Sequence, residues 1–125
     1  MEEESWIEKA ERDLLAAEVN LREGFHDVSA FLSSIAAEKA LKALYILKFK
    51  RLWKTHDLVG LGEKIGADDK TMRLLEPLNE HYIKTRYPSD IVYTKKIAKE
   101  AMNTSRKVLE WVKEQDEKLI LKKVK

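Results

Sequence analysis

One segment, between Asp27 and Lys50, limits the fold of this chain more than any other. Its apolar residues recur at helical spacing, but they fall on nearly every side of the helix that they predict. A helix that is apolar almost all round is enclosed by neighbouring helices. We therefore predict a central helix that Asp27 caps and that ends near Phe49 or Lys50. The apolar residues of this segment are Val28, Phe31, Leu32, Ile35, Ala36, Ala37, Ala40, Leu41, Ala43, Leu44, Ile46 and Leu47.

The remaining segments predict the helices that enclose this one. Ser5 and Glu8 form a capping-box pattern ahead of an apolar stripe, and Gly24 follows the stripe as a stop signal. These signals predict a first helix over about residues 6–22. Three further helical patterns follow, over Leu58–Ile65, from Asp68 to Tyr82, and after Thr94.

The composition supports one fold class. The 125 residues include only 4 Gly and 2 Pro, and no segment alternates polar and apolar residues for long enough to predict a strand. The length suits a single domain that spans residues 1–125. We expect an all-α fold, an antiparallel up-and-down bundle of four to five helices.

Composition and spacing also exclude several classes of function. There is no Cys, which excludes disulfides, thiolate metal sites and cysteine nucleophiles, and none of the 3 His lies one helical turn from another. We therefore expect no metal and no cofactor. The acidic start of the chain, and the lack of an apolar run of ~20 residues, predict a cytoplasmic protein without a membrane segment. The net charge of +2 does not by itself indicate a partner.

Three short motifs are more specific than the composition. They read Ala-Ala-Glu-Lys-Ala-Leu-Lys-Ala-Leu at 36–44, Thr-His-Asp-Leu at 55–58 and Tyr-Ile-Lys-Thr-Arg-Tyr-Pro at 82–88. With a Trp near the start and the Ala-rich last helix that holds Trp111, they resemble the HEPN domain family over about the whole chain. The resemblance implies a small helical bundle that forms homodimers. It also implies a frequent partner, a minimal nucleotidyltransferase, in a toxin–antitoxin-like pair.

The same resemblance implies two kinds of activity. Many members resemble metal-independent ribonucleases with an Arg and a His spaced R-x(4–6)-H, and others bind nucleotides only. Arg51 and His56 match that spacing as R-x4-H. A His titrates near neutral pH and can accept the proton of a 2′-hydroxyl group, while a guanidinium can stabilise the charge that develops at phosphorus.

Two features of the Arg51–His56 segment favour another role. Leu52 follows Arg51 where the ribonuclease members usually carry Asn, and the motif lies directly after the central helix rather than towards the last long helix. His56 and Asp57 can instead cap the next helix, with His56 stacked on Trp53. The sequence therefore leans towards a binding module and away from an enzyme.

A second set of residues predicts a site for a nucleotide or RNA. Glu38 and Lys42 lie one turn apart on a helix that is otherwise apolar, so they either line a polar cleft or form an exposed stripe. Tyr82, Arg86 and Tyr87 combine a phosphate-binding cation with aromatic faces that can stack on a base. Alternatively, these tyrosines are structural residues of the turn.

From the sequence we predict a homodimeric HEPN module that partners a nucleotidyltransferase and binds a nucleotide or RNA through this second set. Two alternatives stay open. One is a metal-independent ribonuclease toxin that uses Arg51 and His56, and the other is a non-catalytic interaction scaffold. Cleavage of RNA in the presence of EDTA distinguishes the first alternative, and flat titrations against nucleotides and oligoribonucleotides distinguish the second.

Overall fold

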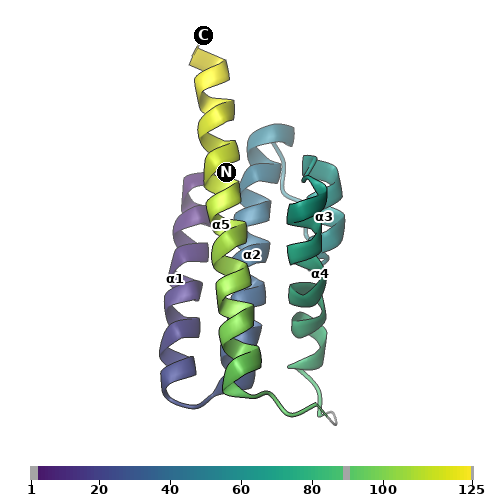
Figure 1. Ribbon diagram of the computed structural model, residues 1–125. Coiled ribbons are helices and arrows are strands. Elements are labelled where there is room, and N and C mark those ends of the chain that lie inside the picture. The colour runs from purple at the N-terminus through teal and green to yellow at the C-terminus, as the bar shows by residue number, and fades with distance from the viewer. Residues whose placement is uncertain (1–2, 89–90, 125) are drawn as a thin grey trace.

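The computed structural model describes residues 3–88 and 91–124, with side chains up to residue 118, and these residues form helices and connections without a strand. The helices are α1 (Glu3–Arg22), α2 (His26–Phe49), α3 (Leu58–Ile65), α4 (Asp69–Lys84) and α5 (Lys95–Val124). The four long helices alternate in direction along one axis, and short α3 lies beside α4 (Figure 1). The predicted all-α antiparallel bundle is confirmed.

Helix α2 is the centre of the bundle, as its apolar pattern predicts. It packs against each of the other four helices. Its residues from Ala40 to Leu47 are all buried, and Leu41 and Leu44 belong to a core that α3, α4 and α5 also supply. Charged residues are seldom buried unless they are paired. A charged residue in the buried part of α2 is therefore a candidate for a functional role.

The predicted starts of the first two helices are wrong. Helix α1 begins at Glu3, so Ser5 lies inside the helix and does not cap it; Glu3 and Glu4 occupy the first turn, where carboxylates favour the helix dipole. Helix α2 begins at His26, which places Asp27 in the first turn, and no side chain caps this end. The predicted stop at Gly24 is confirmed by its positive φ of 85°.

The connection after α2 folds back along that helix. Lys50 adopts a left-handed conformation with a φ of 58°, and the chain then returns until His56 lies beside Glu38, in the middle of α2. Helix α3 starts there. Its first amide, that of Leu58, donates to Asn79 Oδ1 of α4 at 2.9 Å. The predicted side-chain cap from Asp57 is wrong, because the Asp57 carboxylate accepts from the Asn79 amide at 3.3 Å instead.

Other predicted helix ends are confirmed. Asp68 accepts the Thr71 amide at 2.8 Å and caps α4, and the Ile97 amide donates to Thr94 Oγ1 at 3.2 Å at the start of α5. Helix α4 ends at Lys84, four residues before Pro88, so the predicted break in this segment is confirmed, whereas Pro77 lies inside the helix. No helix in the described part of the chain is long and apolar enough to cross a membrane.

A contact between His81 and Tyr93 joins the end of α4 to the segment before α5. His81 Nδ1 lies 3.0 Å from Tyr93 Oη, and the two rings meet edge to face. Burial lowers the pKa of His81 from its ordinary value of 6.5 and raises the pKa of Tyr93. The neutral forms of both side chains therefore suit this contact.

We predict that His81 makes the fold less stable in mild acid. As the pH falls below about 6.5, the unfolded chain takes up a proton on His81 before the folded chain does, so the free energy of unfolding decreases until the lower folded pKa is passed. Urea denaturation between about pH 7 and pH 5 should show a smaller decrease for His81→Gln than for the wild type. Tyr93→Phe keeps His81 buried and should retain the decrease; an identical pH profile for His81→Gln and wild type would contradict the account.

Candidate functional site

The three motifs of the HEPN resemblance meet in the structure. The return of the chain after α2 brings His56 to the middle of α2, and α4 brings Tyr82 to the same place. Glu38 comes from the first motif, His56 from the second, and Tyr82 and Arg86 from the third. We call Glu38, Lys42, His56, Tyr82 and Arg86 the α2–α4 site. Residues far apart in the sequence thus form one cluster at the surface of the bundle.

Glu38 is the buried anchor of the α2–α4 site. The Glu38 side chain is 7% exposed, and one carboxylate oxygen accepts a hydrogen bond from Lys42 Nζ at 3.1 Å. The Lys42 side chain is 8% exposed. The other oxygen lies 2.9 Å from His56 Nδ1. The burial of both charges contradicts the exposed-stripe interpretation, and the polar cleft stays a prediction. A charged group this deep in the bundle requires both partners.

The sequence did not predict the further neighbour of Lys42. Its Nζ lies 5.9 Å from the centroid of the Trp6 ring of α1, a cation–π geometry. Lys42 therefore sits between a carboxylate and an aromatic face. The only signal for this contact was the Trp near the start of the chain. Because Glu38 and Trp6 cover the ammonium group of Lys42, this group is not open to a ligand. Lys42 is therefore a positioning residue for Glu38.

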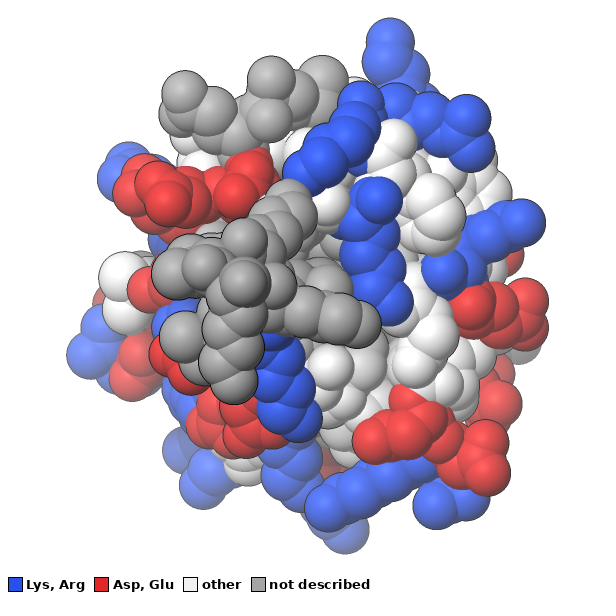
Figure 2. All heavy atoms as spheres, turned by 90° about the horizontal axis from the view of Figure 1, so that it is seen from above, with Lys and Arg blue, Asp and Glu red and all other residues white. Residues whose placement is uncertain are grey.

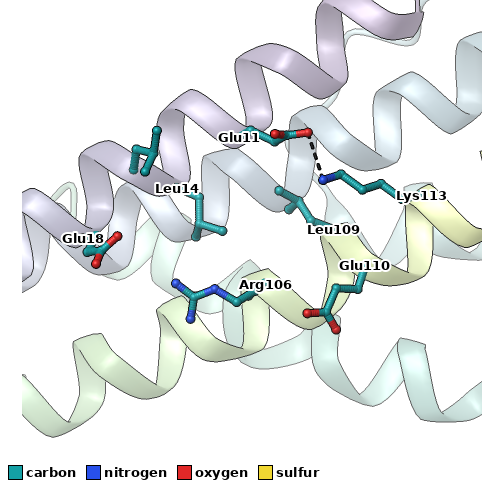
Figure 3. Close-up of a pocket in the computed structure, with 8 residues that line it drawn as sticks. Glu11, Leu14, Glu18, Arg106, Leu109, Glu110 and Lys113 are labelled. Carbon is teal, nitrogen blue, oxygen red and sulfur yellow. Dashed lines mark ion pairs between the residues drawn. The ribbon is translucent and has the colours of Figure 1, made fainter.

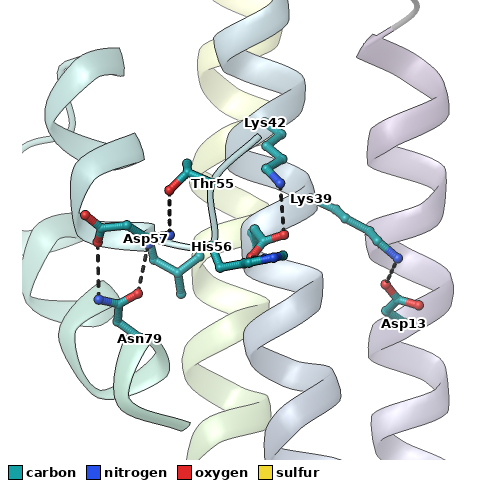
Figure 4. A network of polar contacts seen from close by, with 9 residues as sticks. Asp13, Lys39, Lys42, Thr55, His56, Asp57 and Asn79 are labelled. Atoms are coloured by element: carbon teal, nitrogen blue, oxygen red, sulfur yellow. Dashed lines mark hydrogen bonds and ion pairs between the residues drawn. The ribbon is translucent and has the colours of Figure 1, made fainter. Parts of the chain in front are cut away.

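His56 is the exposed acid–base group of the site. Its side chain is 60% exposed, although its Nδ1 lies 2.9 Å from Glu38 Oε1. Figure 4 shows His56 on the connection after α2, close to that helix. An ionised carboxylate only accepts hydrogen bonds, so Nδ1 carries the proton. Nε2 then has no hydrogen-bond partner among the described residues. In the neutral ring Nε2 can accept a proton or hydrogen bond, and in the protonated ring it can donate one to a phosphate oxygen.

Aromatic rings support His56 on the α4 side. The His56 and Tyr82 rings stack with centroids 4.5 Å apart and 18° between their planes, and Phe31 lies 5.8 Å beyond Tyr82. The predicted stacking of His56 on Trp53 is wrong. Trp53 instead packs against Tyr45, at 5.8 Å, and against the core. Phe31 belonged to the predicted apolar set of α2, and nothing in the sequence distinguished its contact with Tyr82.

Arg86 places a cation beside the same ring. Its guanidinium carbon lies 4.8 Å from the Tyr82 ring centroid and 5.7 Å from that of Tyr87. Arg86 is exposed, and Tyr87 is 61% exposed. The predicted residues Tyr82, Arg86 and Tyr87 thus do lie together, and Tyr82 connects them to His56. A guanidinium and an imidazole converge on one aromatic ring.

The structure does not bring Arg51 into this cluster. Arg51 is exposed in the connection after α2, and within the described residues no hydrogen bond, ion pair or ring contact joins it to His56. It belongs to a group of exposed basic residues at that end of the bundle, Lys48, Lys50, Arg51 and Lys54. Figure 2 looks onto this end and shows Lys and Arg side chains gathered on one side of it. A catalytic pairing of Arg51 with His56 stays a prediction.

The described residues hold no cluster of three or more His, Asp and Glu side chains that could bind a metal ion. The α2–α4 site itself offers three kinds of chemical group. These are a carboxylate-held imidazole, a guanidinium and exposed aromatic surface. Together they suit a ligand with a phosphate and a base.

The structure is a small five-helix bundle with a polar cluster between α2 and α4. Comparison with known proteins identifies the family to which this bundle belongs. The chain matches the model of the HEPN domain over residues 3–115 and belongs to that family. A protein of Methanocaldococcus jannaschii named "Putative toxin MJ1304" is 29% identical, over 87% of this chain and 84% of that protein.

Two solved structures are similar in fold. TT1696 from Thermus thermophilus superposes with a TM-score of 0.80 and 26% identity, covering 90% of this chain and 96% of that one. ST0689, described as an archaeal HEPN homologue, has a TM-score of 0.76 and 29% identity, covering 92% and 98%. The similarity extends over nearly the whole length of each protein. The family implied by the three motifs is confirmed.

We predict that Glu38 stabilises the fold through its buried pair. Glu38→Gln leaves the Lys42 charge buried without an anion and should lower the free energy of unfolding by about 3–5 kcal/mol. The pair of Glu80 and Lys84 is a matched control, because it has the same spacing and the same 3.1 Å distance but is exposed. Glu80→Gln should cost only about 0.3–0.5 kcal/mol in the same urea denaturation. Equal losses for the two variants would show that burial of the Glu38 pair carries no weight.

Proposed function

We propose that this HEPN protein binds a nucleotide or RNA at the α2–α4 site, and that it does so as a homodimer partnered by a minimal nucleotidyltransferase in a toxin–antitoxin-like pair. One observation carries the binding proposal: His56 and Arg86 converge on Tyr82, while buried Glu38 fixes the orientation of His56. The relative named "Putative toxin MJ1304" supports the toxin-like part of this proposal.

Each group of the site has a distinct role in this proposal. Arg86 binds a phosphate group, because a guanidinium donates two parallel hydrogen bonds to phosphate oxygens. His56 Nε2 contributes a further hydrogen bond. Tyr87 offers the exposed aromatic face on which a base can stack, whereas Tyr82 is covered by its neighbours and acts as their support. Glu38 and Lys42 position His56 from the interior.

We predict that Arg86→Ala weakens ligand binding about tenfold or more, because it removes a charged hydrogen-bonding partner of the phosphate. The measurement is calorimetric titration of the purified protein with AMP, ATP and a short oligoribonucleotide. Arg73→Ala is the control, since Arg73 is an exposed arginine of α4 that lies outside the site. Unchanged binding by Arg86→Ala would contradict the site, and flat titrations of the wild type would favour the scaffold alternative.

A second function is favoured by a specific observation: metal-independent cleavage of RNA. The exposed Nε2 of a His held by a carboxylate can accept the proton of a 2′-hydroxyl group as its oxygen attacks the adjacent phosphorus. The bond from phosphorus to the 5′-oxygen then breaks, which leaves a 2′,3′-cyclic phosphate, and the departing 5′-oxygen takes a proton from the imidazolium or from water. A nearby guanidinium stabilises the charge on the phosphoryl oxygens. Two arginines are candidates for this guanidinium. Arg86 contacts the same Tyr82 ring as His56 in the structure, and Arg51 matches the R-x4-H spacing in the sequence.

We predict that, if the protein cleaves RNA, cleavage persists in EDTA and falls about a hundredfold or more in His56→Ala, since general acid–base catalysis contributes about that much. Parallel assays of Arg51→Ala and Arg86→Ala decide which arginine acts, and the larger loss identifies it. A wild type that cleaves RNA as fast as His56→Ala would exclude this mechanism. An inactive wild type that still binds the oligoribonucleotide supports the binding module.

A further inference from the structure

Helices α1 and α5 form a second surface feature, a groove of about 330 Å³ (Figure 3). Its apolar residues are Leu14, Leu15 and Leu109. The groove also contains five charged residues of both signs, Glu11, Glu18, Arg106, Glu110 and Lys113. One ion pair, Lys113 to Glu11 at 3.0 Å, crosses from α5 to α1. We call this surface the α1–α5 face.

The α1–α5 face exposes apolar side chains that nothing in the described residues covers. Leu15 is 63% exposed, and Val19, one turn later on the same side of α1, is 46% exposed. Both lie off the buried stripe of Ala10, Ala17 and Leu21 that packs α1 onto the bundle. Single exposed apolar residues are common, but a pair beside a groove marks a surface on which a partner can pack.

Charge changes sign along this face. At the start of α1 a second hollow of about 300 Å³ contains four carboxylates, Glu4, Glu8, Asp116 and Glu117, beside Ile7 and a single cation, Lys113, which is paired with Glu11. Burial, and then the neighbouring carboxylates Glu3, Glu4 and Glu117, raise the pKa of Asp116. Like charges therefore crowd at this end of the face without enough cations to balance them.

The opposite end of the face is basic. Arg22 follows Leu15 by two turns on α1, and Lys99 precedes Arg106 by two turns on α5, so each continues its helix's side of the groove. The end of α1 and the start of α5 lie at the same end of the bundle, because Leu21 of α1 packs against Ala98 and Met102 of α5. The face thus runs from an acidic end, across exposed Leu15 and Val19, to a basic end.

We infer that a second copy of this chain covers the α1–α5 face, related to the first by a twofold axis near Leu15. A twofold axis across the groove places the acidic end of each copy on the basic end of the other and Leu15 on its own counterpart, with the Val19 side chain of each copy one turn to either side of the axis. A surface that complements itself in this way fits another copy better than an unrelated protein. The inference rests on the homodimer in the proposed function and names its interface.

This interface leaves the α2–α4 site accessible. Helix α1 contacts neither α3 nor α4, and it lies on the other side of α2 from them (Figure 1). A partner centred on Leu15 therefore does not cover His56 or Arg86. Dimerisation and ligand binding can be measured independently in the same protein.

The first test is Leu15→Glu, measured by sedimentation velocity over a range of protein concentrations. We expect a dimeric wild type and a dissociation constant at least about a hundredfold higher for the variant, since it places two carboxylates at the apolar centre. Ile83→Glu is the matched control, because Ile83 is 59% exposed on α4, away from the face, and this variant should stay dimeric. Circular dichroism establishes that each variant retains its helices.

The second test fixes the orientation. Glu4→Lys with Glu8→Lys makes both ends of the face basic, and Arg22→Glu with Lys99→Glu makes both ends acidic. Each double variant should be monomeric alone, and an equimolar mixture of the two should form a heterodimer. A mixture that stays monomeric overturns the antiparallel arrangement, and a dimeric Leu15→Glu overturns the face itself. A monomeric wild type overturns the homodimer as well, whereas the titrations of Arg86→Ala still decide ligand binding.

Discussion

The carboxylate of Glu38 is the interaction on which the rest of the site depends. It lies in the middle of the most buried helix, where an isolated charge is costly, and each of its oxygens has a partner. Lys42 neutralises it from the same helix. His56 reaches it only because the connection after α2 returns along that helix. The pairing of a buried acid with an exposed imidazole therefore links the core of the bundle to its functional surface.

The same constraint organises the surrounding elements. Holding His56 against α2 places the start of α3 beside α4, where Asn79 provides the cap that Asp57 does not. Tyr82 then fills the space beside His56, and Arg86 follows in the turn just after the end of α4. The aromatic stack and the guanidinium are thus consequences of how α4 packs on the returning chain. A ligand bound to Arg86 would be in contact with a group whose orientation is set in the core.

The sequence predicted the bundle well because helix periodicity is a local property. The apolar circumference of α2 identified the central helix, and Gly24, Asp68 and Thr94 marked helix ends correctly. The ends that were wrong depend on distant residues or on competition between signals. The amide of Leu58 finds its acceptor on α4, a contact that no pattern around residue 57 encodes.

The members of the site could be predicted, but not their arrangement. Charge on an apolar helix identified Glu38 and Lys42, and residue type identified His56, Tyr82 and Arg86. The pairing of His56 with Glu38, and its stacking on Tyr82 in place of Trp53, depends on the path of the connection, which periodicity does not determine. The sequence indicated the α1–α5 face only weakly, through two apolar residues, Leu15 and Val19, that lie outside the apolar stripe of their helix.

The most direct test of the central claim is an NMR titration that follows the imidazole ring signals of all three histidines during addition of AMP or a short oligoribonucleotide. If the ligand binds beside the carboxylate-held imidazole, the Nε2 and Cε1–H resonances of His56 should shift with saturation, and those of His26 should stay in place. Saturable binding that leaves the His56 ring unchanged, or that shifts His26 instead, would contradict the account.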